Sequence, residues 1–432
     1  MRLKSLFALW FPLALSFELM MAEGPAIQSA IGHLPDPKLN LAAFGLALSL
    51  SLLIESPIIM LLATAIALVK DEQSFRALRK FVVDLSLLCT VLTFFVAFTP
   101  LFDLIARDVM GMPGRIVVAA KPAMQIMLLW TAAIGWRRFY QGVLVKYKQT
   151  RFVTWGTTFR LSAAMCAAFA LVRGARLPGV QVGAISLMAA VIVEAIATTL
   201  FANKLVREHI DGHLSETPPI SQGEIFRFHL PLAATTLLAL LAQPLTSAAL
   251  ARLDFSVNTL AAWPVTYLIL LILRGWGFAI QEITVSQAKN VSAHPALLKF
   301  AWIVGGVTSG AACLVVFTPI LKFYLKNALQ LPEEVHAYVR VGVVGCLFLP
   351  LFTALGSRIR GILVAGGQTK AVYQGMFVNL SINSILLIIG VLMRLPGMWV
   401  ASISLSVATL IELIYLAPRA RSFTFEPHSE VE

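Results

Sequence analysis

The sequence predicts an all-α polytopic membrane protein with about twelve transmembrane helices, arranged as two parallel six-helix repeats around a central cleft. Three observations lead to this fold class. Apolar residues make up 58% of the 432 residues and charged residues only 13%, whereas soluble globular proteins carry about 25% charge. The apolar residues gather in segments long enough to cross a bilayer. The second half of the chain repeats the first half in register.

Twelve apolar segments can be identified, each sufficient for one crossing at about 20 residues per span. They lie at 6–31, 40–69, 81–105, 117–145, 152–173, 177–203, 226–251, 257–288, 298–323, 337–365, 371–393 and 396–418. The first segment follows Arg2 and Lys4, as a signal peptide would. It is too long for one and lacks a small-residue cleavage site, so we predict a retained helix.

The basic residues predict the orientation of these spans. When Lys and Arg outside the spans are assigned to alternating sides, 17 fall on one side and 9 on the other. The positive-inside rule then places both termini in the cytoplasm. This bias accounts for most of the net charge of +12, so no nucleic-acid partner is expected.

The polar stretches divide the chain into lobes. We predict an N-terminal six-helix lobe over 1–205, a cytoplasmic linker over 206–224, a C-terminal six-helix lobe over 225–420 and a polar cytoplasmic tail over 421–432. The linker contains Pro218 and Pro219, which suit an extended connection.

An internal repeat supports the division. At an offset of 219 residues the two halves match without gaps over most of their length, and after the loss of one residue the offset becomes 218. The matches include prolines, glycines and polar residues that apolar composition does not produce by chance: Pro12-Leu13-Ala14 with Pro231-Leu232-Ala233, Pro25 with Pro244, Phe98-Thr99-Pro100 with Phe317-Thr318-Pro319, Gly142 with Gly361, Gln149-Thr150-Arg151 with Gln368-Thr369-Lys370, and Arg176-Leu177-Pro178-Gly179 with Arg394-Leu395-Pro396-Gly397.

Six is an even number of spans, so both units enter the membrane in the same orientation. They are expected to be related by a pseudo-twofold axis along the membrane normal, with a shared cleft between them. Secondary transporters with parallel repeats are built in this way, and their two lobes rock about a central site.

The chain also resembles a known family. The segments that carry the resemblance are Ala26-Ile27-Gln28-Ser29-Ala30, the run Leu41 to Leu50, Trp263-Pro264-Val265, Arg274-Gly275-Trp276, Arg360-Gly361 and Gln368-Thr369-Lys370. With two six-helix halves and prolines in the first and seventh spans, they resemble the multidrug/oligosaccharidyl-lipid/polysaccharide (MOP) flippase superfamily, whose best-known branch is the multidrug and toxic-compound extrusion (MATE) transporters. Within it, the chain looks closest to bacterial relatives of the progressive ankylosis protein.

The resemblance implies a MATE-like two-lobed fold, alternating access, and export driven by an ion gradient or by the gradient of the substrate itself. The ankylosis branch is associated with export of pyrophosphate, nucleotide or citrate-like anions. The extrusion branch exports organic cations in exchange for protons or sodium, often through an acidic residue on the first span. Here Glu18 and Glu23 occupy that span in place of the usual aspartate.

Ionisable residues inside the membrane are costly and therefore candidates for function. Glu55 in the second span aligns with Arg274 in the eighth at the offset of 219. If both line the cleft, they form an inter-lobe gate pair, or Glu55 binds a coupling proton or sodium ion while Arg274 holds an anion. The alternative is that each is paired within its own lobe, for example Arg274 with Glu282.

Further cations repeat between the halves. Lys121 and Arg340 align near the outer ends of the fourth and tenth spans; they either raise the potential of the cleft and attract anions, or extend to the outer membrane surface. The pairs Arg137-Arg138 and Arg358 with Arg360 either form an inner gate that guides anions or reach the phosphates of cytoplasmic lipids. For Arg138 and Arg358 the lipid interpretation is favoured.

The remaining acidic residues and prolines complete the candidate site. Glu18, Glu23 and Glu55 are candidates for ion coupling, since buried acids can bind a proton near working pH. Glu194 and Glu412 repeat in the sixth and twelfth spans, which resemble peripheral helices of this superfamily, so pairing within a lobe, such as Glu194 with Arg160, is at least as well supported as a transport role. Helix kinks are expected at three prolines: Pro25, Pro57 and Pro244.

The sequence lacks a phosphate-binding loop that ends in Lys-Ser/Thr, histidine pairs with metal-ligand spacing and a catalytic triad, so we expect neither an enzyme nor a cofactor beyond a coupling proton or sodium ion. The spans hold eight Lys or Arg against six Glu. We therefore expect a secondary transporter that exports a small organic or phosphorylated anion by rocking of the lobes. The alternatives are a proton- or sodium-coupled extruder of drugs or organic cations, then a lipid or lipid-linked sugar flippase. We expect a monomer surrounded by lipids in a bacterial inner membrane.

Overall fold

The computed structural model of the protein describes residues 3–147, 149–174, 176–210, 212, 220–287 and 293–421. The described residues form helices and no strands. The first half comprises α1 (Leu3–Met21), α2 (Glu23–Gly32), α3 (Pro37–Ile59), α4 (Leu61–Leu68), α5 (Glu72–Phe98), α6 (Leu101–Asp103), the π-helix η1 (Leu104–Val109), α7 (Gly114–Ile126), the 3-10 helix η2 (Met127–Leu129), α8 (Trp130–Lys146), α9 (Thr150–Gly174) and α10 (Gly179–His209). The second half comprises α11 (Gln222–Ala251), α12 (Ser256–Gln287), α13 (His294–Phe317), α14 (Pro319–Phe323), the π-helix η4 (Tyr324–Ala328), α15 (Glu333–Val344), α16 (Leu349–Ala365), α17 (Thr369–Leu392) and α18 (Gly397–Arg421).

The described helices fit the predicted layout of about twelve crossings. Among the described residues, ten helical segments are long and apolar enough to span a membrane, and α15 with α16, bent by 41° at their junction, form an eleventh. The first crossing is α1, whose apolar part covers Leu3–Leu15, followed by α2. Large apolar side chains are exposed on the outer helices, for example Leu88 on α5 and Val307 on α13, at 64% and 66%. Such a belt suits contact with lipid, and the protein is a multi-pass membrane protein.

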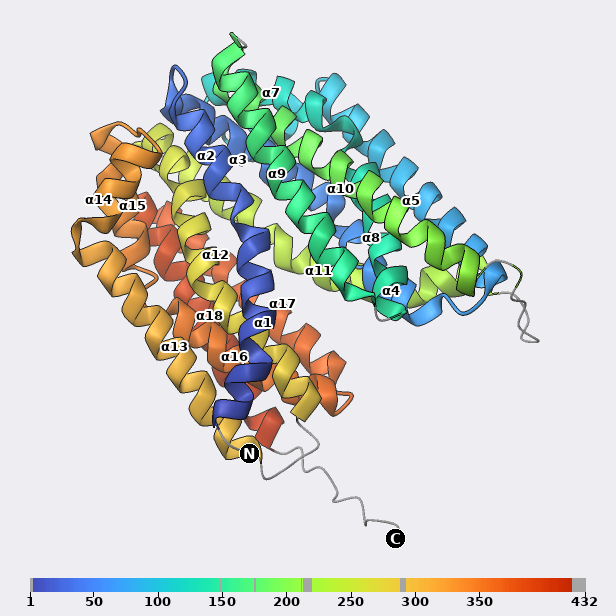
Figure 1. The fold of residues 1–432 in the computed structure, drawn as a ribbon. Helices are drawn as coiled ribbons and strands as arrows, with labels where there is room; N and C mark the ends of the chain where they lie inside the picture. The colour runs from blue at the N-terminus through green and yellow to red at the C-terminus, as the bar shows by residue number, and fades with distance from the viewer. Residues whose placement is uncertain are drawn as a thin grey trace.

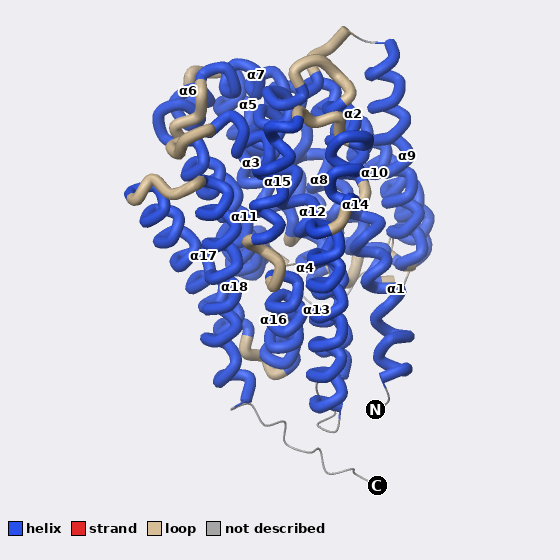
Figure 2. The backbone as a smooth tube through the Cα atoms, turned by 90° about the vertical axis from the view of Figure 1, so that its left-hand side faces the viewer, coloured by secondary structure: helices blue, strands red, loops and turns tan. Residues whose placement is uncertain are grey.

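Two bundles stand side by side in Figure 1, one built mainly from α2–α10 and the other mainly from α12–α18, while α1 lies along the second bundle and α11 extends to the first. By chain order, we call α1–α10 the N-lobe and α11–α18 the C-lobe. Figure 2 shows the long helices running in roughly one direction, with loops at the two ends of the molecule. Helix α10 ends at His209 and α11 begins at Gln222, so residues 206–209 and 222–224 of the predicted linker at 206–224 are helical; residues 211 and 213–219 of it, and 422–432 of the predicted tail, lie outside the described residues.

The repeated motifs fold in the same way in both lobes. Thr99-Pro100 ends α5 and Thr318-Pro319 ends α13, with both threonines extended, because a residue before proline disfavours the helical conformation. A π-helix follows each of these prolines. Backbone in the left-handed region also recurs at the offset of 219 residues: Asp36 with Phe255, and Gly111 with Gln330.

The pseudo-twofold axis can be located because two equivalent residues touch each other. A Cβ added to Gly45 on α3 would lie 2.5 Å from Cγ of Pro264 on α12, its partner at the offset of 219. Residues related by a twofold rotation meet only at the axis, so the axis passes between α3 and α12. Close approach at this crossing requires glycine at position 45.

The first helix of each lobe packs on the other lobe. Trp10 on α1 donates its indole N–H to the carbonyl of Trp276 on α12 (2.9 Å). In the equivalent place, Gln222 at the start of α11 donates to the carbonyl of Ala77 on α5 (2.8 Å), and His229 donates through Nε2 to the carbonyl of Pro57 (2.7 Å). Each lobe is thus joined to its partner by the helix that begins it.

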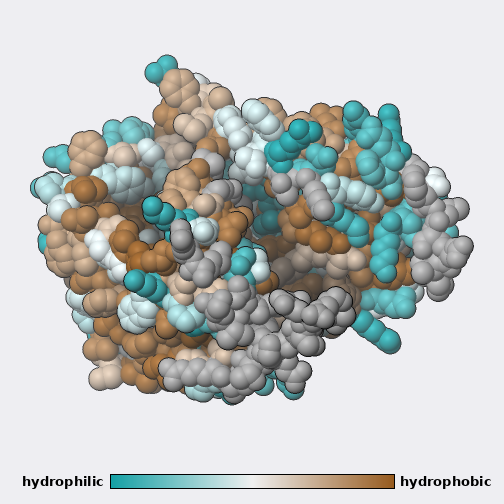
Figure 3. All heavy atoms as spheres, turned by 60° about the horizontal axis from the view of Figure 1, so that its bottom comes forward, coloured by the Kyte–Doolittle hydropathy of each residue, from teal (hydrophilic) through white to brown (hydrophobic). Residues whose placement is uncertain are grey.

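The lobes also touch on the side opposite the start of α1. Lys38, after the loop between α2 and α3, forms an ion pair with Glu334 on α15 (3.1 Å). The hydroxyl of Ser29 donates to the carbonyl of Ala328, and Arg252 donates to the carbonyl of Met110 (2.6 Å). On the side where α1 begins, the surface is hollowed between the lobes (Figure 3). The structure is therefore closed on one side and hollowed on the other.

Candidate functional site

A cavity of about 390 Å³ lies between the lobes at the pseudo-twofold axis. Its walls are largely symmetric, because they include seven pairs of residues related by the offset of 219: Gly24/Gln243, Gln28/Ser247, Phe44/Trp263, Gly45/Pro264, Leu48/Tyr267, Ser49/Leu268 and Leu52/Leu271. Residues of these pairs form two hydrogen bonds with one another: Gln28 donates to the carbonyl of Pro264 (3.2 Å), and Trp263 donates to the amide oxygen of Gln243 (3.1 Å). This is the central cleft that the repeat predicts.

The charged part of the cavity is not symmetric. The charged residues that line it, within the described part of the chain, all belong to the N-lobe: Glu23, Glu55, Arg137, Arg138 and Arg160. Their counterparts at the offset of 219 are Ala242, Arg274, Gly356, Ser357 and Asn379, and none of these lines the cavity. The cavity therefore has an apolar, symmetric part at the axis and a charged extension into the N-lobe.

Most of these charges are paired. Arg160 on α9 forms an ion pair with Glu23 (2.5 Å) and lies 3.5 Å from Glu194 on α10. Arg137 on α8 pairs with the same Glu194, and Gln141, one turn later, donates to its other oxygen (3.0 Å). Glu194 is 1% exposed, so its charge is stabilised only by these partners. The predicted pairing of Arg160 with Glu194 is confirmed.

The C-lobe contains a smaller version of this cluster. Arg360 on α16 forms an ion pair with Glu412 on α18 (2.8 Å), and Asn379 on α17 donates to the second oxygen of Glu412 (2.9 Å). Arg360 aligns with Gln141, and Asn379 aligns with Arg160. Both lobes thus hold a buried glutamate between guanidinium and amide groups. The amide and the guanidinium are exchanged between the two equivalent helix positions, and the N-lobe adds a second guanidinium, that of Arg137.

Two charged groups of the cavity have no ionic partner at bonding distance. Glu55 accepts a hydrogen bond from the indole N–H of Trp130 (2.5 Å) and forms no ion pair. Arg138 forms neither an ion pair nor a hydrogen bond within the part of the chain that the structure describes, and its Nε is buried without a partner. Both face the cavity, so a ligand there would meet one carboxylate and one guanidinium that are not already bound to an opposite charge.

The position of Arg138 corrects one interpretation of the sequence, which assigned it to lipid phosphates. Arg138 and Gly142 lie one turn apart on the same face of α8. A Cβ added to Gly142 would lie 2.5 Å from Cβ of Ala65 and 2.7 Å from the carbonyl oxygen of Leu62, so this face packs against α4. The face therefore points into the protein and not toward lipid.

Arg274 and Glu55 do not touch in this structure. Arg274 donates through Nε to the hydroxyl of Thr353 (2.8 Å) and its guanidinium lies over the ring of Phe278, 5.4 Å from the centroid. It forms no ion pair with Glu282 or any other described carboxylate. Glu55 and Arg274 are pseudo-equivalent, but only the wall that contains Glu55 opens onto the cavity.

Lys121 and Arg340 lie away from the cavity. Lys121 forms an ion pair with Asp103 on α6 (2.7 Å), and this hydrogen bond holds the pKa of the Asp103 carboxyl below its usual range. Arg340 on α15 is exposed.

The other acidic and proline residues are distributed as follows. Glu18 lies at the contact of α1 with α12, where a Cβ on Gly275 would meet its carboxylate oxygen at 2.2 Å. Pro25 follows the break between α1 and α2, Pro57 lies two residues before the end of α3, and Pro244 lies within the continuous helix α11. Of the three acids predicted for ion coupling, Glu23 and Glu55 line the cavity.

Three polar partners escaped the sequence analysis: Trp130, Gln141 and Asn379. None is charged, and in an apolar span an indole or amide gives no signal of its own. The alignment of Gln141 with Arg360 and of Arg160 with Asn379 could have pointed to two of them.

The fold is shared with known transporters. A comparison of the sequence with models of protein families gives no match, and neither does a comparison with curated proteins. Among solved structures, an inward-facing multidrug resistance MATE family transporter of the MOP superfamily matches with a TM-score of 0.71 at 14% identity, covering 96% of this chain and 98% of that one. The lipid II flippase MurJ, in an inward closed conformation, matches with a TM-score of 0.73 at 14% identity, covering 96% and 88%. A MOP superfamily transporter from Pyrococcus furiosus with a binding pocket of reverse polarity matches with a TM-score of 0.66 at 15% identity, covering 96% of each chain. The chain has the two-lobed fold of MATE and MurJ transporters of the MOP superfamily, as the sequence analysis predicted.

Proposed function

We propose that this protein is a secondary active transporter that exports a small organic or phosphorylated anion by alternating access of the two lobes. The observation that carries the proposal is Arg138, an arginine without an ionic partner on the wall of the central cavity. A buried charge without a partner costs several kcal/mol, so its retention in a site accessible to solutes favours a ligand of opposite charge.

The charge balance of the cavity supports an anion that is accompanied by a proton. Three arginines (Arg137, Arg138 and Arg160) face three glutamates (Glu23, Glu55 and the underlying Glu194), so the cluster is neutral when all are ionised. Protonation of Glu55 leaves one net positive charge at Arg138. Glu55 is therefore our proposed site for a coupling proton, with sodium as the alternative ion.

The membrane potential and the oligomeric state complete the proposal. With both termini in the cytoplasm of a bacterial inner membrane, the electrical potential favours exit by about 2.3 kcal/mol per 100 mV for each net negative charge that the anion and its proton carry together. One chain encloses the cavity with its own two lobes, so we propose that a monomer is the functional unit.

An extruder of organic cations, coupled through Glu23 or Glu55, is the alternative. Glu23 is already bound to Arg160, which leaves Glu55 alone for a cation and places Arg138 in the same cavity as a repulsive charge. A flippase of lipid-linked molecules comes third. MurJ, which shares the fold, is a lipid II flippase.

Uptake in proteoliposomes tests the proposal, with labelled citrate, labelled pyrophosphate and ethidium as probes. Removal of a charged hydrogen-bonding partner typically costs 1.5–3 kcal/mol, so Arg138→Ala should lower uptake of the transported anion at least about tenfold, with partial retention in Arg138→Lys. Arg151→Ala, on the exposed start of α9, is the control and should transport normally. Transport of ethidium but of neither anion by the wild type would contradict the proposal.

The coupling ion is tested separately with Glu55→Gln. If Glu55 carries the proton, this variant should transport the anion at a rate that no longer changes with pH, while the wild-type rate does. A sodium dependence that Glu55→Gln abolishes would assign sodium to the site instead. Normal pH dependence in the variant would remove Glu55 from the coupling step.

A further inference from the structure

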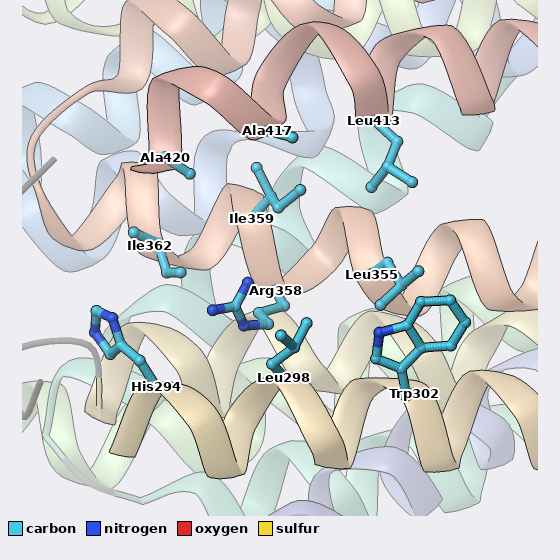
Figure 4. A pocket seen from close by; sticks show the side chains of 10 residues that line it. All are labelled: His294, Leu298, Trp302, Leu355, Arg358, Ile359, Ile362, Leu413, Ala417 and Ala420. Atoms are coloured by element: carbon cyan, nitrogen blue, oxygen red, sulfur yellow. The ribbon is translucent and has the colours of Figure 1, made fainter. Parts of the chain in front are cut away.

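A second pocket, separate from the central cavity, lies on the outer side of the C-lobe. It has a volume of about 460 Å³ and is formed by α13, α16 and α18 (Figure 4). Its walls are mostly apolar, and Arg358 is the one arginine or lysine among the described residues that line it. For this arginine the sequence favours a lipid phosphate over an inner gate.

Arg358 is free to bind a ligand. It forms no ion pair and no hydrogen bond with another described residue, and its Nε is buried without a partner. The nearby carboxylate on α18, Glu412, is bound to Arg360 and Asn379. In Figure 4 the guanidinium extends from α16 across the pocket toward the side chain of His294 on α13. An anion in the pocket would therefore meet a guanidinium whose donors are unused.

The rim of the pocket faces lipid. Leu298 and Trp302 on α13 line it and are 40% and 53% exposed, and exposed apolar residues continue along the same helix at Ile303 and Val307. A tryptophan at such a rim is typical of the membrane interface. A ligand that enters sideways from the bilayer must have an apolar part for these walls and an anionic head for Arg358.

The pocket lies at the level in the membrane where phospholipid head groups lie. His294 is the first residue of α13, and Ala420 is the second-last residue of α18, so the pocket reaches the end of both spans. Arg358 lies seven residues before the end of α16, about 10 Å from it at 1.5 Å per residue, within reach of a phosphate at the surface. This is the side on which α1 begins, which the basic residues predict to be cytoplasmic.

We propose that this pocket binds an anionic phospholipid of that leaflet, with its phosphate on Arg358 and its acyl chains along Leu298, Trp302 and Leu355. The site does not depend on the transported substrate, because none of its residues lines the central cavity. Arginine suits this role, because its planar fork matches the oxygens of a phosphate.

Native mass spectrometry of the delipidated full-length protein tests the proposal, with phosphatidylglycerol and phosphatidylcholine as probes. The wild type should bind one phosphatidylglycerol in preference to phosphatidylcholine. Arg358→Ala should weaken that first binding event about tenfold, with a smaller loss in Arg358→Lys. Arg151→Ala removes an exposed arginine from the same side of the N-lobe and should bind as the wild type does.

A second variant, which fills the pocket, keeps the test decisive even if Arg358→Ala does not fold. Ala417→Phe keeps Arg358 but fills the pocket, and it should lose the same lipid. If Arg358→Ala, or a folded Ala417→Phe, bound phosphatidylglycerol with the affinity of the wild type, the proposal would be overturned. Binding of inorganic phosphate in lipid-free detergent with an affinity equal to that for phosphatidylglycerol would also overturn it, since the ligand would then be a soluble anion.

Discussion

Glu194 and Glu412 occupy equivalent positions but form ion pairs with different numbers of arginines. Glu194 is bound by Arg137 and Arg160, whereas Glu412 is bound by Arg360 alone, whose side chain is 18% exposed. Removal of one partner from a buried ion pair costs about 3–5 kcal/mol, because the remaining charge is left without compensation. Glu194→Gln should therefore lower the melting temperature in detergent much more than Glu412→Gln. Equal effects would mean that Arg137 and Arg160 find other partners.

At the residue scale, the sequence predicted which charges lie inside the membrane but not which of them meet. The pairing of Arg160 with Glu194 could be anticipated, because both lie on neighbouring spans of one lobe. The lack of an ionic partner at Arg138 could not be anticipated, because it depends on which of the three nearby arginines pair with Glu23 and Glu194. That choice follows from the packing of α8, α9 and α10, which the pattern of apolar residues does not specify.

At the scale of the helix, two equivalent glycines allow equivalent crossings. Gly142 lies against Ala65 and Leu62, and Gly361 lies against Thr284 and Gln281, which are their partners at the offset of 219. A Cβ at either glycine would come within 2.7 Å of a neighbouring atom. Overpacking costs about 1–3 kcal/mol, so Gly142→Val and Gly361→Val should both reduce the yield of monodisperse protein and its melting temperature.

The control for this pair is Gly306→Val on α13, where a Cβ would meet no atom within 4 Å. It should leave yield and melting temperature close to those of the wild type. If only one of the two crossing glycines proves sensitive, the lobes do not depend equally on this contact, and the structural equivalence at this crossing does not extend to stability.

At the scale of the whole molecule, the fold was largely predictable because duplication doubles every weak signal. Thr99-Pro100 alone indicates a helix end, but its recurrence at Thr318-Pro319 fixes the register of two lobes at once. The predicted symmetry did not extend to the charges. Ala242, Gly356 and Ser357 stand where the N-lobe has Glu23, Arg137 and Arg138, so the two halves share one fold while only one supplies the charged wall of the cavity.

Alternating access requires the contacts opposite the start of α1 to break during transport. Ser29 on α2 donates to the carbonyl of Ala328, at the end of η4 in the other lobe, and the side chains of Lys38 and Glu334 are paired nearby. In a background without the four native cysteines, Ser29→Cys with Ala328→Cys should therefore form a disulfide that holds this side closed. Uptake of whichever probe the wild type carries should stop on oxidation and return on reduction.

The matched control is a cross-link that spans no lobe boundary. Lys204 and Glu208 lie one turn apart on α10 and are both exposed. Lys204→Cys with Glu208→Cys, joined by a short bifunctional thiol reagent, should leave uptake unchanged, because α10 moves as one body with its lobe. Full activity of the oxidised Ser29→Cys/Ala328→Cys protein would show that transport proceeds without separation of the lobes on this side, and rocking of rigid lobes would then be the wrong mechanism.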